Sequence, residues 1–380
     1  MKQIYLDNAA TTPVDNRVLR GMQEYFDEKY GNASSQHQKG QEAKRALEES
    51  REIIARSINC KVDEIIFTSG GTESNNLAIK GLAFANPDKK HIIISKIEHD
   101  CVLNACKWLE SREYKITYLN VDSEGFIDMN QLKKEINENT LLVSVIHGNN
   151  EIGTIQDLKV IGKICREKGV YFHTDACQSY TKTNLNVRKQ NLDLVTLNAH
   201  KIHGPKGVGA LYIKEGIKLV PIAHGGGHEQ GIRSGTENIP GIVGFAKAVS
   251  ICKSKYIKHM EKLRDYMIQK ILKIPNTKLN GAQGKKRLCN NISICFNNIE
   301  GEAIGGYLDS YGISSSTGSA CSSHSLESSH VLKALGLIDL QANSSIRLSL
   351  SRENTKEEID YALETLKKVV EKLRKISPFK

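Results

Sequence analysis

The sequence predicts an α/β fold with a large domain built on a mostly parallel sheet and a smaller α+β domain. Short apolar runs alternate with segments of helical spacing over the first two thirds of the chain, and the last third is mainly helical with few strand-like runs. The chain has 380 residues, and single cores stop growing near ~250–300 residues. We therefore expect a large domain at residues 13–249 and a small domain at residues 1–12 and 250–380.

The first part of the chain predicts strands that alternate with helices. Residues 4–6 are strand-like, residues 7–13 form a polar turn, and helical periodicity follows at 14–25 and 40–57. A β-rich run at 64–68 ends in a glycine turn before helical spacing at 73–84. Further strand-like runs lie at 91–95, 116–119, 141–147, 170–174, 192–197 and 210–213. This alternation favours a parallel sheet that is covered on both faces.

The last third predicts the small domain. One long helix at residues 245–273 is expected to join it to the sheet. Strand-like runs follow at 291–296 and 346–350, and a periodic helix at 356–375 closes the chain.

Composition favours a soluble protein, with 39% apolar and 25% charged residues. The chain begins with no signal-like apolar run and has no segment of ~20 apolar residues, so we expect a cytoplasmic protein without a membrane segment. The formal charge of +10 is scattered among acidic residues. A solvated surface is therefore expected rather than a nucleic-acid site, with weak attraction of an acidic partner as the alternative.

The cysteines and histidines do not predict a metal site. Nine cysteines are present, and no two have the spacing of a zinc knuckle or a redox pair. His224 and His228 lie among glycines without a carboxylate or cysteine at ligand spacing. Cys101 and Cys106 are interpreted as packing residues of a helix.

The turn at Thr68-Ser-Gly-Gly-Thr-Glu73 connects a predicted strand to a predicted helix. Free backbone N–H groups and the helix dipole at such a position favour a phosphate. An ordinary strand-to-helix turn would also use glycine, so this signal is weak by itself.

Two further residues follow apolar strands. Asp175 is placed at the carboxyl end of a strand, where ligands bind in open α/β folds, although a helix cap would also explain it. Lys201 lies just past the next strand, beside His200 and near glycines, where a dry pocket would suit an imine-forming amine. Phosphate loop, acid and lysine occur in the order that pyridoxal 5'-phosphate (PLP) requires.

The chain resembles the cysteine desulfurases of the iron–sulfur cluster and nitrogenase-associated type over essentially its whole length. The matching stretches are Tyr5-Leu-Asp-Asn-Ala-Ala-Thr-Thr-Pro13, Asn149-Asn-Glu-Ile-Gly153, His224-Gly-Gly-Gly-His228, Arg233-Ser-Gly-Thr236 and Ser344-Ser-Ile-Arg347. The resemblance implies fold type I of the PLP-dependent transferases, with class-V aminotransferases as relatives.

The resemblance also assigns roles to residues. Lys201 would hold PLP covalently, Asp175 would pair with the ring nitrogen, and His99 would stack over the ring and help with proton transfers. Arg347 would receive the substrate carboxylate. The other cofactor contacts would come from Gly71, Thr72, Asn150, Gln178, Asn198, His200 and, across a dimer interface, Thr236, with Asn150 also near the substrate. Asn198 stands where many relatives have serine, which weakens the expectation of a phosphate contact there.

Cys321 lies in the run Ser314-Ser-Ser-Thr-Gly-Ser-Ala-Cys321-Ser-Ser, which resembles the long-loop desulfurase signature. Small polar residues bury little surface, so a mobile loop is expected at about residues 314–326. Cys321 would take the sulfur of L-cysteine as a persulfide, leave L-alanine, and pass the sulfur to an acceptor or scaffold protein, most naturally for iron–sulfur cluster assembly. Selenocysteine lyase, another fold type I enzyme, sulfur donation for tRNA thiolation, and a non-enzymatic interaction protein remain alternatives.

Overall fold

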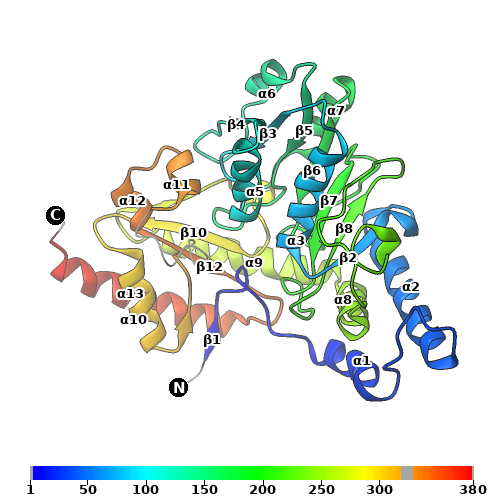
Figure 1. The fold of residues 1–380 in the computed structure, drawn as a ribbon. Coiled ribbons are helices and arrows are strands. Elements are labelled where there is room, and N and C mark those ends of the chain that lie inside the picture. The colour runs from blue at the N-terminus through cyan, green and yellow to red at the C-terminus, as the bar shows by residue number, and fades with distance from the viewer. Residues whose placement is uncertain (1–2, 318–327, 379–380) are drawn as a thin grey trace.

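The computed structural model describes residues 3–317 and 328–378 (Figure 1). Cys321 and most of the predicted loop therefore lie outside the described residues. Within the described chain, no helix combines the length and apolarity needed to cross a membrane.

A seven-stranded sheet forms the centre of the larger part of the molecule, in the order β2-β8-β7-β6-β5-β3-β4 (Figure 1). β8 is antiparallel to both of its neighbours, whereas the other pairs are parallel. The strands are β2 (Ile65–Thr68), β3 (His91–Ser95), β4 (Lys115–Leu119), β5 (Thr140–Ser144), β6 (Tyr171–Asp175), β7 (Leu194–Asn198) and β8 (Gly209–Ile213). The mostly parallel sheet is confirmed.

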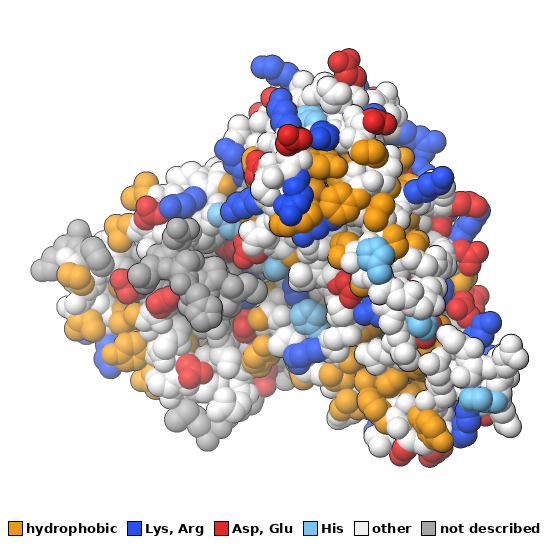
Figure 2. Space-filling view, in the orientation of Figure 1, with side chains coloured by type: hydrophobic (Ala, Val, Ile, Leu, Met, Phe, Trp, Pro, Cys, Tyr) orange, Lys and Arg blue, Asp and Glu red, His pale blue; other side chains and the backbone are white. Residues whose placement is uncertain are grey.

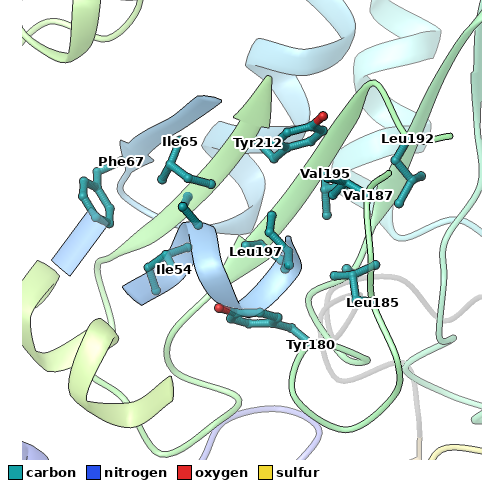
Figure 3. Packing of buried hydrophobic residues seen from close by; sticks show 14 of the residues in the cluster. Ile54, Ile65, Phe67, Tyr180, Leu185, Val187, Leu192, Val195, Leu197 and Tyr212 are labelled. Atoms are coloured by element: carbon teal, nitrogen blue, oxygen red, sulfur yellow. The ribbon is translucent and has the colours of Figure 1, made fainter. Parts of the chain in front are cut away.

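Both faces of this sheet are buried because successive side chains of each strand point to opposite sides. Ile65 and Phe67 pack in one apolar cluster, shown in part in Figure 3, and Ile66 packs in another. The first cluster includes residues of α1 (Asn16–Asp27), α2 (Gln38–Ile58), α6 (Met129–Glu135), α7 (Leu158–Glu167) and α8 (Ile239–Ile251). The second includes residues of η2 (Leu77–Gly81), α4 (Leu82–Ala85) and α5 (Asp100–Glu110), and α3 (Gly71–Asn76) runs directly into η2. The sheet thus forms the middle of three layers.

A second apolar core lies in the remaining part of the chain. An antiparallel sheet, in the order β12-β10-β9, packs there with long helices. The N-terminal Ile4 and Leu6 belong to this core, because β1 pairs with β11. The helices and strands of this part of the chain, together with β1, are β1 (Ile4–Tyr5), α9 (Ser254–Ile271), β9 (Thr277–Leu279), β10 (Asn291–Phe296), α10 (Gly301–Ser310), β11 (Ile313–Ser314), α11 (His330–Ala334), α12 (Asp339–Asn343), β12 (Ser345–Ser349) and α13 (Lys356–Ile376). Residues of α11 and α12 pack in a smaller separate cluster with Ile97, Ile146 and Ile152. The domain boundaries at residues 13 and 249 stay a prediction.

The single long helix predicted at residues 245–273 is wrong. α8 ends at Ile251 and α9 begins at Ser254, and between them Cys252 and Lys253 have extended backbones with ψ of 130° and 147°. Neither residue is a glycine or proline, so the helical spacing continues through the break and conceals it.

Charged side chains of both signs are interspersed over the face seen in Figure 2. This view agrees with the scattered charge inferred from the sequence.

Candidate active site

The carboxyl ends of two neighbouring strands carry the predicted cofactor residues. Asp175 is the last residue of β6, and Asn198 is the last residue of β7, which pairs with β6. Lys201 follows three residues after Asn198. Because neighbouring parallel strands end at the same edge, the sheet brings these residues together at the position where open α/β folds bind ligands.

Asp175 is a buried carboxylate, and each of its two oxygens accepts a hydrogen bond. It accepts hydrogen bonds from the Asn75 side-chain amide at 2.7 Å and from the Cys177 backbone N–H at 2.8 Å. Burial alone would raise the pKa of Asp175, but His99, which is charged at the acid pH where a carboxyl group titrates, and these hydrogen bonds outweigh burial and hold the pKa below its ordinary value. Asp175 is therefore ionised at neutral pH and suited to keep a ring nitrogen protonated.

His99 caps α5. Its Nδ1 atom accepts the backbone N–H of Cys101 at 3.2 Å, and the Cys101 Sγ atom lies 3.1 Å from the same nitrogen. Burial, followed by the charge of Lys201, lowers the pKa of His99. His99 is therefore mainly neutral at pH 7.

The glycine turn after β2 forms a close backbone cradle. Gly70 has a φ of +151°, and Gly71 begins α3, so the first N–H groups of the helix are free of helical partners. A Cβ atom on Gly71 would lie 2.7 Å from the Sγ atom of Cys177 and 3.8 Å from the Asn198 amide nitrogen. A side chain at position 71 would therefore displace Cys177, and the strand end at Asn198 lies beside the glycine turn that contains Thr72.

The remaining predicted cofactor residues are distributed around these groups. Gln178 donates from its side-chain amide to the Ala9 carbonyl at 2.7 Å, and the His200 Nδ1 atom lies 3.2 Å from the Thr11 hydroxyl. The N-terminal segment therefore closes this side of the site.

Thr236 is exposed on a separate loop. Arg233 links that loop to the glycine turn after β2 through an ion pair with Glu73 at 2.8 Å. The contact of Thr236 with a second subunit stays a prediction.

Arg347 enters the site from β12 of the second sheet. It is almost fully buried, pairs with Asp7 at 2.8 Å, and donates to the backbone carbonyl of Asn150 at 3.1 Å. Its Nε atom is buried and has no hydrogen-bond partner within residues 3–317 and 328–378. A buried donor of this kind calls for an acceptor, and a carboxylate supplies one.

These groups fit PLP. The site combines a buried ionised acid, a lysine amine and a glycine cradle that a Cβ atom would fill. PLP would meet Asp175 through its ring nitrogen, Lys201 through its aldehyde carbon, and the turn at Gly71 through its phosphate.

Three residues of the site escaped the sequence reasoning. Asn75, one turn after Thr72, holds Asp175, and Asp7 holds Arg347. Cys101 was expected only to pack, as Cys106 does in the apolar cluster, yet its thiol contacts both His99 and Asn75. Helical spacing from Thr72 would have found Asn75, whereas the ion pair of Asp7 depends on tertiary structure.

The comparisons agree with this geometry. The aminotransferase class-V family matches residues 4–362. Cysteine desulfurase IscS of Dictyoglomus turgidum is 50% identical over 384 residues, which cover 100% of this chain and 97% of the relative. A solved structure named NifS-like protein has a TM-score of 0.92 and 39% identity, covering 98% of this chain and 100% of its own. Another solved structure, SspA in complex with cysteine, has a TM-score of 0.84 and 38% identity, covering 93% and 100%. The fold is therefore fold type I of the PLP-dependent enzymes, and the chain belongs to the aminotransferase class-V family.

Proposed function

We propose that this chain is a PLP-dependent cysteine desulfurase, which takes sulfur from L-cysteine, releases L-alanine and leaves a persulfide on Cys321. The observation that carries the proposal is the meeting of an ionised Asp175, a neutral His99 and Lys201 at one edge of the sheet. The names of the relatives support the same reaction, and one similar structure is described as a complex with cysteine.

The side chains divide the work of binding. Lys201 would hold PLP covalently, and the turn at Gly71 and Thr72, with Asn198 and His200, would hold its phosphate. Arg347 would receive the substrate carboxylate through its free Nε–H, in the region of Asn150. Gln178 would contact the ring oxygen side, and Thr236 would reach the phosphate of a second subunit in a homodimer.

PLP supplies an electron sink for charge that develops at the substrate Cα atom. The Nζ atom of Lys201 would take the Cα proton, and Asp175 would keep the ring nitrogen protonated by its negative charge. His99 would carry its proton on a ring nitrogen near this centre. Burial of these groups strengthens each electrostatic contact, because water screens them little.

The transfer of sulfur to Cys321 requires no oxidant other than the substrate itself. The thiolate of Cys321 attacks the substrate sulfur, the S–S bond of the persulfide forms and the Cβ–S bond breaks. The electron pair returns to the carbon skeleton, which gains protons and leaves as L-alanine. Cys321 lies outside the described residues, so this assignment rests on the sequence. A sulfur acceptor for iron–sulfur cluster assembly is the partner that we propose.

Alanine formation from L-cysteine tests the proposal. PLP-loaded protein should produce alanine under reducing conditions, and Cys321→Ala should bind PLP but lose this activity. Cys60→Ala is the matched control, since Cys60 is a free, half-buried cysteine outside the site. Equal alanine from Cys321→Ala would exclude a persulfide on Cys321 and favour a lyase that needs no loop thiol. Absence of PLP binding would refute the enzyme assignment.

A further inference from the structure

A side-chain relay connects the two residues that flank the proposed cofactor. The Asn75 amide nitrogen lies 2.7 Å from an oxygen of Asp175 and 3.0 Å from the Sγ atom of Cys101. The same Sγ atom lies 3.1 Å from the Nδ1 atom of His99. Four side chains from three elements, α3, β6 and α5 with its cap, thus form one connected chain of polar contacts.

The chemistry of Asn75 fixes the direction of the first two bonds. The Nδ2 atom of the Asn75 amide, and not the Oδ1 atom, must point toward Asp175, because an amide oxygen would repel the ionised carboxylate. The Oδ1 atom of Asn75 has no partner among the described residues, which agrees with this orientation. One amide hydrogen then points to Asp175 and leaves the other for the sulfur of Cys101.

The thiol of Cys101 can accept a hydrogen bond from Asn75 and donate one to His99, so the donor-to-acceptor direction continues along the chain of contacts. Burial, and then the charge of Asp175, raises the pKa of Cys101 to about 12, so the thiol keeps its proton at neutral pH. Because the sulfur accepts from Asn75, its own S–H is free to donate to Nδ1 of His99. The backbone N–H of Cys101 donates to the same nitrogen at 3.2 Å.

Two donors on one ring nitrogen leave no place for a proton there. We propose that Cys101 is a positioning residue that holds His99 with Nδ1 unprotonated and its proton on Nε2. Through Asn75, the same thiol ties the orientation of His99 to the carboxylate of Asp175. The catalytic consequence rests on the proposed function: His99 offers Nε2–H to the reacting groups as a hydrogen-bond donor and cannot use Nδ1 as a base.

The charges around His99 must be included in any test that follows its protonation. Lys201 and His330 lower its pKa, whereas Asp175 and Asp100 raise it, and burial is the largest influence. His330 is held in place by a hydrogen bond from its Nε2 side to the Glu98 carbonyl at 2.9 Å. A change confined to Cys101 leaves all four of these titratable groups in the chain.

Nitrogen-15 NMR of histidine-labelled, PLP-loaded protein tests the relay, with His99→Asn used to assign the resonances. The wild-type Nδ1 resonance should be that of an unprotonated, hydrogen-bonded nitrogen, and Nε2 should carry the proton. Cys101→Ala should move the Nδ1 resonance toward that of a free unprotonated nitrogen and raise the pKa of His99 by about 0.5 to 1, the effect of one hydrogen bond. Cys101→Ser keeps a donor and an acceptor, and its hydroxyl is a stronger donor than the thiol, so its Nδ1 resonance should lie further from the free value than that of the wild type.

Cys106→Ala is the matched control, because Cys106 is a buried cysteine of the same helix that packs in the apolar cluster. A Cys101→Ala spectrum identical to that of Cys106→Ala, or a wild-type Nδ1 that carries the proton, would overturn the proposal. If Cys101→Ala does not fold, Cys101→Ser decides alone, since its stronger hydroxyl donor must shift the Nδ1 resonance away from the free value and an unchanged resonance would refute the relay. These outcomes are distinct from failure of the proposed function, which alanine formation measures separately.

Discussion

Replacement of Arg347 by lysine tests whether the guanidinium receives the substrate. Arg347 is 3% exposed, and its guanidinium already donates two hydrogen bonds within the protein, one to Asp7 at 2.8 Å and one to the Asn150 carbonyl at 3.1 Å. Three N–H hydrogens remain of the five that a guanidinium has, including the unpartnered one on Nε. A lysine in Arg347→Lys keeps the charge, but it loses the planar fork and has a single nitrogen to share among the same partners.

The expected loss follows from one charge-assisted hydrogen bond. Such a bond contributes about 1.5–3 kcal/mol, which corresponds to a decrease of about 10- to 150-fold in kcat/KM for L-cysteine. The carboxylate is bound in both the ground state and the transition state, because none of its own bonds forms or breaks in the reaction. The decrease should therefore come mainly from a higher KM with little change in kcat.

Steady-state alanine formation over a range of L-cysteine concentrations measures both parameters. Arg264→Lys is the control, because Arg264 is a 2% exposed arginine of α9 whose guanidinium donates to the backbone carbonyls of Arg287 and Leu288. It should leave kcat/KM unchanged per folded, PLP-loaded protein. A kcat/KM of Arg347→Lys within about twofold of wild type, or a loss confined to kcat, would refute the carboxylate role.

Three further predictions concern charge in the interior. Asp175→Asn should keep PLP, measured by absorbance, but lower alanine formation by about 100-fold, and near-normal activity would contradict its role at the ring nitrogen. Arg51→Met leaves the buried carboxylate of Glu229 without its 2.7 Å ion pair and should lower the free energy of unfolding by about 3–5 kcal/mol. The control is Arg56→Met, because Arg56 forms an exposed ion pair on the same helix, and its free energy of unfolding should change by at most about 1 kcal/mol. Equal losses in the two variants would refute the argument. Burial raises the pKa of Glu98 from 4.5 to about 8, so the unfolded chain releases a proton that the folded chain retains, and wild-type stability falls as pH rises through this window. Unfolding of Glu98→Gln should show a stability advantage that grows from pH 4.5 to 8, and parallel pH profiles of the two proteins would contradict the buried proton.

The sequence was informative wherever a strand delivers a residue to the edge of the sheet. Strand length and apolar content determined where β6 and β7 end, and those ends place Asp175 and Asn198 beside each other. The same logic placed the glycine turn after β2. These are local features, since a buried run followed by a polar residue defines the end of a strand without knowledge of its neighbours.

The sequence was uninformative where backbone geometry changes without a change in composition. The break between α8 and α9 occurs at Cys252 and Lys253. When the helical spacing of apolar residues continues across such a break, the sequence cannot distinguish two consecutive helices from one long helix. The short strands β9 and β11, of three and two residues, depend on pairing with distant partners. Their apolar content alone is too small to predict a strand.

Polar contacts between segments far apart in the sequence form the part of the site that the sequence pattern did not predict. Asp7 and Arg347 are 340 residues apart, and Asn75 and Asp175 are 100 apart, yet each pair shares a hydrogen bond. Cys101 looked like a packing residue because a buried thiol on a helix usually is one. Its contact with His99 follows from the N-cap, which folds the imidazole back over the first turn of α5 and places Nδ1 beside residue 101. A histidine that caps a helix thereby has its tautomer constrained by the helix itself, so the side chain two positions later is where such a site can be tuned without altering a catalytic group.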